Sequence, residues 1–193
     1  MAQSAEPLIT TGPALTPAPQ QVSPPPLSEQ LPVHTRPPGP PAPGQEPPRW
    51  WWLGCHGGAG ATTLATTVHG GWEAFRAWPD PRWGGPTVVV LVCRSHERGM
   101  SAASSVIRQW LAGATPPVTV WGLVIMADAP GKLPKQLSAQ RRRLAGTVEH
   151  TFTVPWVEPW RASDFSPDNS PRELTRLRKE LDSSSWTQKG TTA

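Results

Sequence analysis

Two long apolar runs restrict the fold of this chain more than any other feature. Residues Thr87–Cys93 read Thr-Val-Val-Val-Leu-Val-Cys, and residues Val118–Ala127 are almost as apolar. Both runs are too short to span a bilayer as a helix. Neither run alternates apolar with polar residues, as a half-exposed strand does. They are therefore typical of strands that are buried on both faces of a parallel sheet.

Strand-like and helix-like segments alternate around these two runs. The pattern predicts further strands at 50–55 and 150–154, and helices at 62–78, 100–112 and 133–145. The sequence Ser170-Pro171-Arg172-Glu173 predicts a capping box at the start of a last helix, whose apolar stripe is Leu174, Leu177 and Leu181. The βαβαβαβ order predicts an α/β fold, in which helices cover both faces of a parallel sheet.

Composition divides the 193 residues into four parts. Residues 1–48 contain more than half of the 26 prolines and few residues that form a core, which predicts a disordered tail with polyproline II character. Residues 49–160 form the predicted core, 161–184 a linker and the last helix, and 185–193 a second disordered tail. The proline clusters 24–26 and 37–41 either dock on an aromatic groove of a partner or belong to a solubilising tether.

The charge and the cysteines set limits on the environment and the partners. The net charge of +4 permits contact with nucleic acid or an anionic surface but does not demand it. The first residues lack the basic and apolar regions of a signal peptide, so we expect a cytoplasmic protein without integral membrane association. In that compartment Cys55 and Cys93 are expected to be reduced thiols.

A glycine-rich loop joins the first predicted strand to the first predicted helix. Residues 55–64 read Cys-His-Gly-Gly-Ala-Gly-Ala-Thr-Thr-Leu. A strand, a glycine turn and a helix N-terminus form the setting in which backbone N–H groups converge on an anion. The general phosphate-binding pattern, G-x-x-x-x-G-K-[ST], has a lysine where this chain has Ala61.

The loop resembles the deviant phosphate-binding loop of the ParA/MinD family of ATPases, which reads K-G-G-x-G-K-[ST]-T. The matching residues are Gly57, Gly58, Gly60, Thr62 and Thr63. The stretches 88–112 and 121–128 and Pro155-Trp156 are also similar to family segments, so the likeness covers about residues 50–160. It implies a truncated three-layer P-loop NTPase-like core that binds ATP or ADP with Mg²⁺. The chain further resembles small actinobacterial proteins of unknown function with a His-Gly-Gly-Ala-Gly loop.

The resemblance also implies a binding site. Its nucleotide- or phosphate-binding residues are His56, Gly57, Gly58, Ala59, Gly60, Ala61, Thr62 and Thr63. Thr62 would contact the metal of a Mg²⁺-nucleotide, and Asp128 would lie near the base. With a pKa near neutrality, His56 would be cationic beside a phosphate.

Three departures from the family argue against hydrolysis. His56 and Ala61 replace its two lysines, one of which reaches across a dimer in that family. The strand whose aspartate holds Mg²⁺ is missing, because the stretch 79–86 offers only Asp80, which lies between two prolines. Phosphoryl transfer depends on positioning and charge stabilisation. We therefore predict no catalytic residue and a non-hydrolysing nucleotide-binding or scaffolding factor, whose partner is another protein or a second copy.

Other interpretations stay open. The loop can be a tight strand-to-helix turn that only the fold requires. It can also belong to an active ATPase of DNA partitioning or protein positioning, to which Lys132 or Lys135 would supply the missing charge. A basic cluster on helix 133–145 is either a solvated face or the DNA contact of an accessory protein. This cluster consists of Lys132, Lys135, Arg141, Arg142 and Arg143.

Eleven tryptophans are an unusual number for a chain of this length. Because strand side chains alternate, Trp51 is expected to face away from Trp50 and Trp52. Together with Trp156 and Trp160 they fill the core or form an exposed patch for a partner. The histidines and cysteines lack the spacing of metal ligands, so no metal site is predicted.

Overall fold

The computed structural model describes residues 22–40, 44 and 46–184. Among them, five parallel strands form one sheet in the order β2-β1-β3-β4-β5. The strands are β1 (Trp50–Gly54), β2 (Gly71–Glu73), β3 (Val88–Arg94), β4 (Thr119–Met126) and β5 (His150–Val154). The helices are α1 (Ala61–Thr67), α2 (Glu97–Leu111), α3 (Lys135–Ala145) and α4 (Arg172–Ser183). Short 3₁₀ turns are η1 (Leu27–Glu29), η2 (Pro81–Trp83), η3 (Glu158–Ala162) and η4 (Pro167–Asn169).

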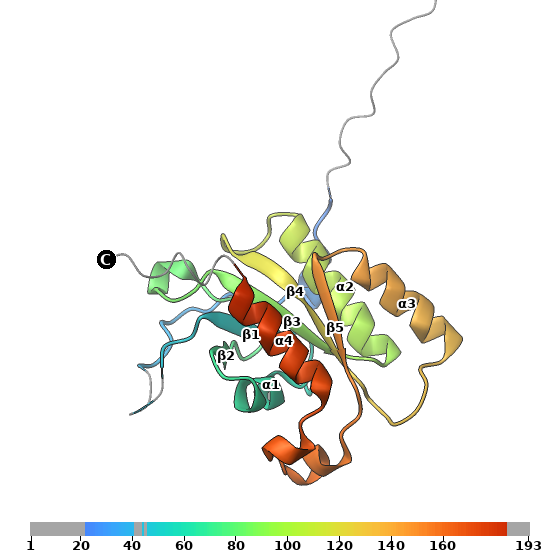
Figure 1. Cartoon of the computed structure of the whole chain (residues 1–193). Coiled ribbons are helices and arrows are strands. Elements are labelled where there is room, and N and C mark those ends of the chain that lie inside the picture. The colour runs from blue at the N-terminus through green and yellow to red at the C-terminus, as the bar shows by residue number, and fades with distance from the viewer. Residues whose placement is uncertain (1–21, 41–43, 45, 185–193) are drawn as a thin grey trace, which may run out of the picture.

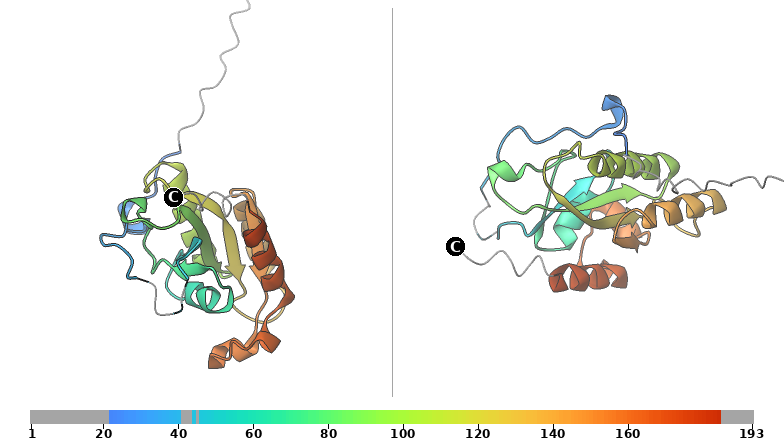
Figure 2. Two further views of the ribbon diagram at one scale, coloured as in Figure 1. Left: turned by 60° about the vertical axis from the view of Figure 1, so that its left-hand side comes forward. Right: turned by 90° about the horizontal axis from the view of Figure 1, so that it is seen from above.

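The predicted α/β fold is confirmed, with helices on both faces of the sheet (Figures 1 and 2). One face packs against α2 and α3, through residues such as Val106 and Leu144. The other face packs against α1 and α4, through Leu64 and the predicted stripe Leu174, Leu177 and Leu181. No described helix is both long and apolar enough to cross a membrane.

The two apolar runs form the central strands β3 and β4, which are buried on both faces as predicted. The three tryptophans of β1 also alternate as predicted. Trp51 packs on the side of α2, whereas Trp50 and Trp52 pack on the side of α1 and α4. All three are at most 5% exposed, so this cluster belongs to the core and not to an exposed patch.

The first predicted helix is much shorter than expected, since α1 ends at Thr67 instead of near residue 78. The chain turns at Gly70, with φ 100°, and enters the edge strand β2. Gly71 is required there, because a Cβ at this position would lie 2.1 Å from the Trp50 indole nitrogen. The tight packing of the tryptophans against β2 therefore ends the helix.

The last helix starts without the predicted capping box. Pro171 is its N-cap residue and no side chain caps it. Pro171 has an extended backbone, with ψ 147°, which displaces Ser170 from the first helical turn. The Glu173 carboxylate contacts Arg172 instead of reaching back to the cap.

Part of the predicted N-terminal tail is packed against the domain, so the expectation of disorder over residues 1–48 is wrong for residues 25–34. Leu31 is 6% exposed, and its backbone N–H and C=O bond to the side chain of Gln109 on α2. Val33 pairs with Trp78 in an isolated bridge. A side chain with two donors and two acceptor sites thus anchors a segment that has little apolar surface of its own. Residues 1–21 and the predicted tail 185–193 lie outside the described residues.

Two buried thiols lie at the carboxyl ends of the neighbouring strands β1 and β3. Gly54 pairs with Val92, and the next residues along the two strands are Cys55 and Cys93. Burial raises the pKa of Cys93 to about 12. Burial also raises the pKa of Cys55 well above its usual range, and the nearby Cys93 raises it further. Both cysteines are free.

Candidate ligand site at the carboxyl edge of the sheet

The strand order changes direction between β1 and β3. The chain leaves β1 for the edge strand β2 and then returns to β3 on the other side of β1. In open α/β sheets the crevice outside the carboxyl ends of the strands, at such a switch point, is where ligands bind. The predicted loop 56–60 follows β1 at this edge, next to the segments that follow β3, β4 and β5.

The loop forms a tight strand-to-helix turn. Gly58 and Gly60 have positive φ angles of 72° and 102°, and the Ala59 N–H donates to the His56 carbonyl. Gly60 is the N-cap residue of α1, and no side chain in the described part of the chain caps this helix. The first backbone N–H groups of α1 therefore have no side-chain acceptor. Gly57, Gly58 and Thr62 are exposed, whereas Ala59 and Ala61 are buried.

His56 has a structural role in the loop and is neutral in this structure, whereas the predicted cation concerns His56 beside a phosphate. Its Nε2 accepts the Arg94 backbone N–H at 3.0 Å, and its Nδ1 lies 2.8 Å from the Gly57 carbonyl, to which it donates. This pair of bonds requires the neutral ring. Desolvation lowers the pKa of His56, and the electrostatic effects of His96, Arg76 and Arg94 lower it further, against the opposing effect of the Gly57 carbonyl.

The positive charge next to the loop comes from Arg94, the last residue of β3. Its Nε donates to the Gly58 carbonyl at 3.1 Å, and one terminal nitrogen donates to the Ala127 carbonyl at 2.8 Å. The guanidinium therefore connects the loop after β1 to the segment after β4. Sequence analysis did not select this residue, although the first polar side chain after a buried strand is a recognisable signal at a carboxyl edge.

A cavity of about 340 Å³ opens beside this guanidinium. Gly58 and Thr63 line it from the predicted loop, and Arg94, Asp128 and Arg161 line it with charged groups. Trp156 and Trp160, both half-buried, complete it from the segment after β5. Neither the position of the family's lysine, Ala61, nor the predicted metal contact, Thr62, lines this cavity.

A second cavity, of about 580 Å³, adjoins the first and shares Ala127, Asp128, Pro155 and Trp156 with it. Asp128, the residue expected near a base, is held in place because its backbone N–H donates to the Ser95 hydroxyl. Two residues of the predicted basic cluster, Lys132 and Arg141, line this cavity. The other three, Lys135, Arg142 and Arg143, are exposed and line neither cavity.

Two carboxylates between α1 and β3, Glu73 and Asp80, line neither of these two cavities. β2 ends in Glu73, which the predicted long helix had concealed, but Glu73 and Asp80 line a different cavity at the β2 edge. The end of β3 carries Arg94 and not an acidic residue. Among the described residues no group of histidines, cysteines and carboxylates could hold a metal ion.

Comparisons with known proteins identify the family but assign no activity. The model of a family of unknown function, DUF6668, matches residues 49–178, which include the loop, both cavities and most of α4. No curated protein matches the chain. No solved structure matches it either. The resemblance of the loop to the ParA/MinD family therefore stays a prediction.

Proposed function

The chain belongs to DUF6668, a family of unknown function, and we propose that it binds a phosphorylated ligand of the nucleotide class at the carboxyl edge of its sheet. In this proposal the protein acts by binding, as a regulatory or scaffolding factor, and does not hydrolyse the ligand.

One observation carries the proposal: two arginines, Arg94 and Arg161, line a single cavity together with Gly58 and Thr63 of the predicted loop. Arginine suits phosphate because its planar guanidinium presents several fixed donors. The Arg161 guanidinium lies 5.6 Å from the centroid of the Trp156 ring, which orients it. The Trp160 ring, half-buried, adds an aromatic wall to the same cavity.

The same residues argue against catalysis. The loop has no lysine, Ala61 is buried, and His56 is held in its neutral form. Among the described residues, Asp128 is the one carboxylate that lines the cavity. Removing a single preorganised charge-stabilising group slows a reaction by a factor on the order of 10²–10³, and several are missing here.

Calorimetric titration of the full chain with ATP, ADP and inorganic phosphate, with and without Mg²⁺, tests this proposal. We expect saturable binding without turnover. Arg161→Gln should weaken binding about 10- to 150-fold, because a charge-assisted hydrogen bond contributes about 1.5–3 kcal/mol. The matched control is Arg172→Gln on α4, where the arginine side chain is 94% exposed and lines neither cavity. This change should leave binding unaltered.

Two results would contradict the proposal. ATP turnover that Thr62→Ala abolishes would identify an active ATPase. Absence of binding by all three ligands would leave the loop as a strand-to-helix turn that only the fold needs.

A second candidate function, non-specific DNA binding, is favoured by one observation on α3. Residues 129–148 contain no acidic residue, and Lys135, Arg142 and Arg143 are exposed there. Basic side chains that follow a phosphate backbone release counterions, so binding falls steeply with salt. Salt-dependent binding of a DNA duplex, lost when Arg141, Arg142 and Arg143 are replaced by alanine, would support it. Binding that survives this replacement would exclude α3 as the contact.

A further inference from the structure

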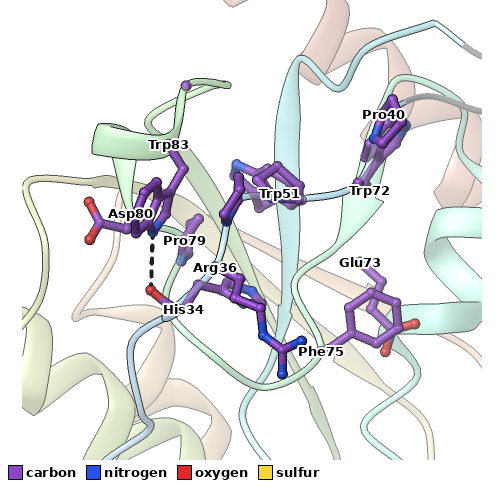
Figure 3. A pocket seen from close by; sticks show the side chains of 14 residues that line it. His34, Arg36, Pro40, Trp51, Trp72, Glu73, Phe75, Pro79, Asp80 and Trp83 are labelled. Carbon is purple, nitrogen blue, oxygen red and sulfur yellow. Dashed lines mark hydrogen bonds between the residues drawn. The ribbon is translucent and has the colours of Figure 1, made fainter.

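A cavity of about 470 Å³ opens at the edge strand β2, on a different part of the molecule from the site above (Figure 3). It shares no lining residue with either cavity of the carboxyl edge. Its volume lies in the range of ligand pockets, about 300–1,000 Å³. Four aromatic side chains from separate segments line it: Trp51 of β1, Trp72 of β2, Phe75 just after β2, and Trp83 of η2.

Two of these aromatic side chains are exposed, and the backbone that carries one of them is strained. Phe75 is 75% exposed and Trp83 is 43% exposed. Phe75 and Arg76 have positive φ angles of 44° and 57°, a conformation that side chains rarely adopt. Hydrogen bonds fix the residue before them, because Ala74 donates to Trp52 and its carbonyl accepts from Ala77. Strain of this kind collects at functional sites, and here it places a phenyl ring at the mouth of the cavity.

The chain's own prolines already pack into this cavity. Pro37, Pro38 and Pro40 are among its lining residues, and Figure 3 draws Pro40 on the same side of the cavity as Trp72. The cavity's indole N–H groups donate to backbone carbonyls: Trp51 to Pro86 at 3.0 Å, and Trp83 to His34 at 3.4 Å. The Trp72 indole N–H has no acceptor within the described part of the chain. A proline segment offers carbonyls and ring faces but no N–H groups, and this lining is complementary to both.

The charges around the cavity favour an uncharged occupant. Arg36 and Glu73 contribute one charge of each sign to the lining. The third charged group, Asp80, makes several hydrogen bonds to Arg82, which keep its pKa low and compensate its charge. A nucleotide or another polyanion would find no excess of positive charge here.

We propose that this aromatic cavity binds a proline-rich segment of a partner protein in the polyproline II conformation. The source is a partner because the chain's own N-terminus runs along α2 before it reaches the cavity. Glu29 bonds to Ser105 and Leu31 to Gln109, both on α2, and only at His34 does the segment meet the cavity. The described part of this segment therefore begins on the α2 side of the molecule and not at the β2 edge.

The test uses ¹⁵N-labelled full chain and a synthetic proline decamer as the probe. The indole N–H resonance of Trp72 is identified by its loss in Trp72→Phe. We expect this resonance to shift saturably as the decamer is added, while a Gly-Ser decamer of equal length causes no shift. Absence of a saturable shift at millimolar decamer would overturn the proposal.

Matched variants separate the cavity from other apolar surfaces. Phe75→Gly removes the ring and suits a positive φ, so the fold is retained, which the thermal unfolding midpoint verifies. It should weaken decamer binding at least about fivefold, as loss of an aromatic anchor does. Leu111→Ala removes another exposed apolar side chain, 49% exposed at the end of α2, and should have no effect. Equal binding by Phe75→Gly and the native chain would overturn the assignment.

A last variant tests the source of the segment. In it, alanine replaces the four prolines that precede Val22, which are Pro7, Pro13, Pro17 and Pro19. If the partner assignment is right, this variant binds the decamer with native affinity. If decamer binding appears only in this variant, the chain's own N-terminus occupies the cavity and the partner assignment is wrong.

Discussion

Replacing Gln109 with methionine tests how the N-terminal segment is attached. Gln109 is 2% exposed on α2, and its side-chain oxygen accepts from the Leu31 N–H and the Trp78 indole N–H, both at 3.0 Å. Its amide nitrogen donates to the Leu31 and Ala114 carbonyls at 3.0 and 3.1 Å. Methionine has a similar volume, so the change removes these four hydrogen bonds, and a longer one of 3.5 Å to the Gln30 side-chain oxygen, without leaving a large cavity.

The expected loss of stability follows from the groups left without partners. Two N–H groups and the Leu31 carbonyl are buried in these bonds, and each unpaired buried group costs about 1–3 kcal/mol. The full sum is not reached, because residues 27–34 can detach instead. Detachment loses the burial of Leu31, about 1.5–3 kcal/mol, and regains chain entropy. We therefore expect Gln109→Met to lower the free energy of unfolding by about 2–4 kcal/mol.

Urea unfolding followed by tryptophan fluorescence measures this loss, and hydrogen exchange shows where it acts. The amide of His34, which donates to the Trp78 carbonyl, should lose protection before the sheet does. The control is Gln136→Met, the same change at an exposed position of α3, with an expected effect under about 0.5 kcal/mol. A loss below about 1 kcal/mol with unchanged protection of His34 would refute the reasoning, because the bonds to Gln109 would then contribute little.

Three further predictions concern the sheet and the loop. Gly71→Ala should destabilise the fold by about 3 kcal/mol or prevent folding, because its Cβ would lie 2.1 Å from the Trp50 indole. The control is Gly146→Ala, where a Cβ meets nothing closer than 3.5 Å, and it should not change the thermal unfolding midpoint. Ala61→Lys, which restores the family's lysine, should lower stability by about 1–3 kcal/mol and produce no ATP turnover, because Ala61 is 6% exposed within the core; a gain of turnover would contradict this. The folded-state pKa of His56 is lowered, so its contribution to stability is complete above about pH 6.5 and is lost as the pH falls through the folded pKa. His56→Gln should remove that part of the pH dependence of urea unfolding, and an unchanged pH dependence would show that His56 does not titrate differently on folding.

The sheet was predictable because its determinants are local. The uninterrupted apolar runs of β3 and β4 can be stable only between two layers of helices, and the alternation of Trp50 and Trp51 follows from strand geometry alone. The length of α1 was not predictable in this way, because Gly71 is needed only where the indoles of Trp50 and Trp52 reach across from the neighbouring strand.

The site was predictable only as far as the loop. The residues that surround the cavity with charge, Arg94 and Arg161, are separated from the loop by about 36 and 100 positions, so no local pattern connects them. The packed N-terminal segment escaped prediction for a related reason. Its anchor is the side chain of Gln109, 78 residues away from Leu31, and a proline-rich composition gives no sign of it.

The alkylation rates of the two buried thiols report how often the carboxyl edge of the sheet opens. Alkylating reagents attack the thiolate, and the raised pKa values of Cys55 and Cys93 keep both groups protonated and shielded in the closed protein. Labelling can therefore proceed only when the edge opens, and its rate measures the frequency of opening. Because Cys55 directly precedes His56, a ligand held by the loop should slow its alkylation in proportion to occupancy, without any introduced probe.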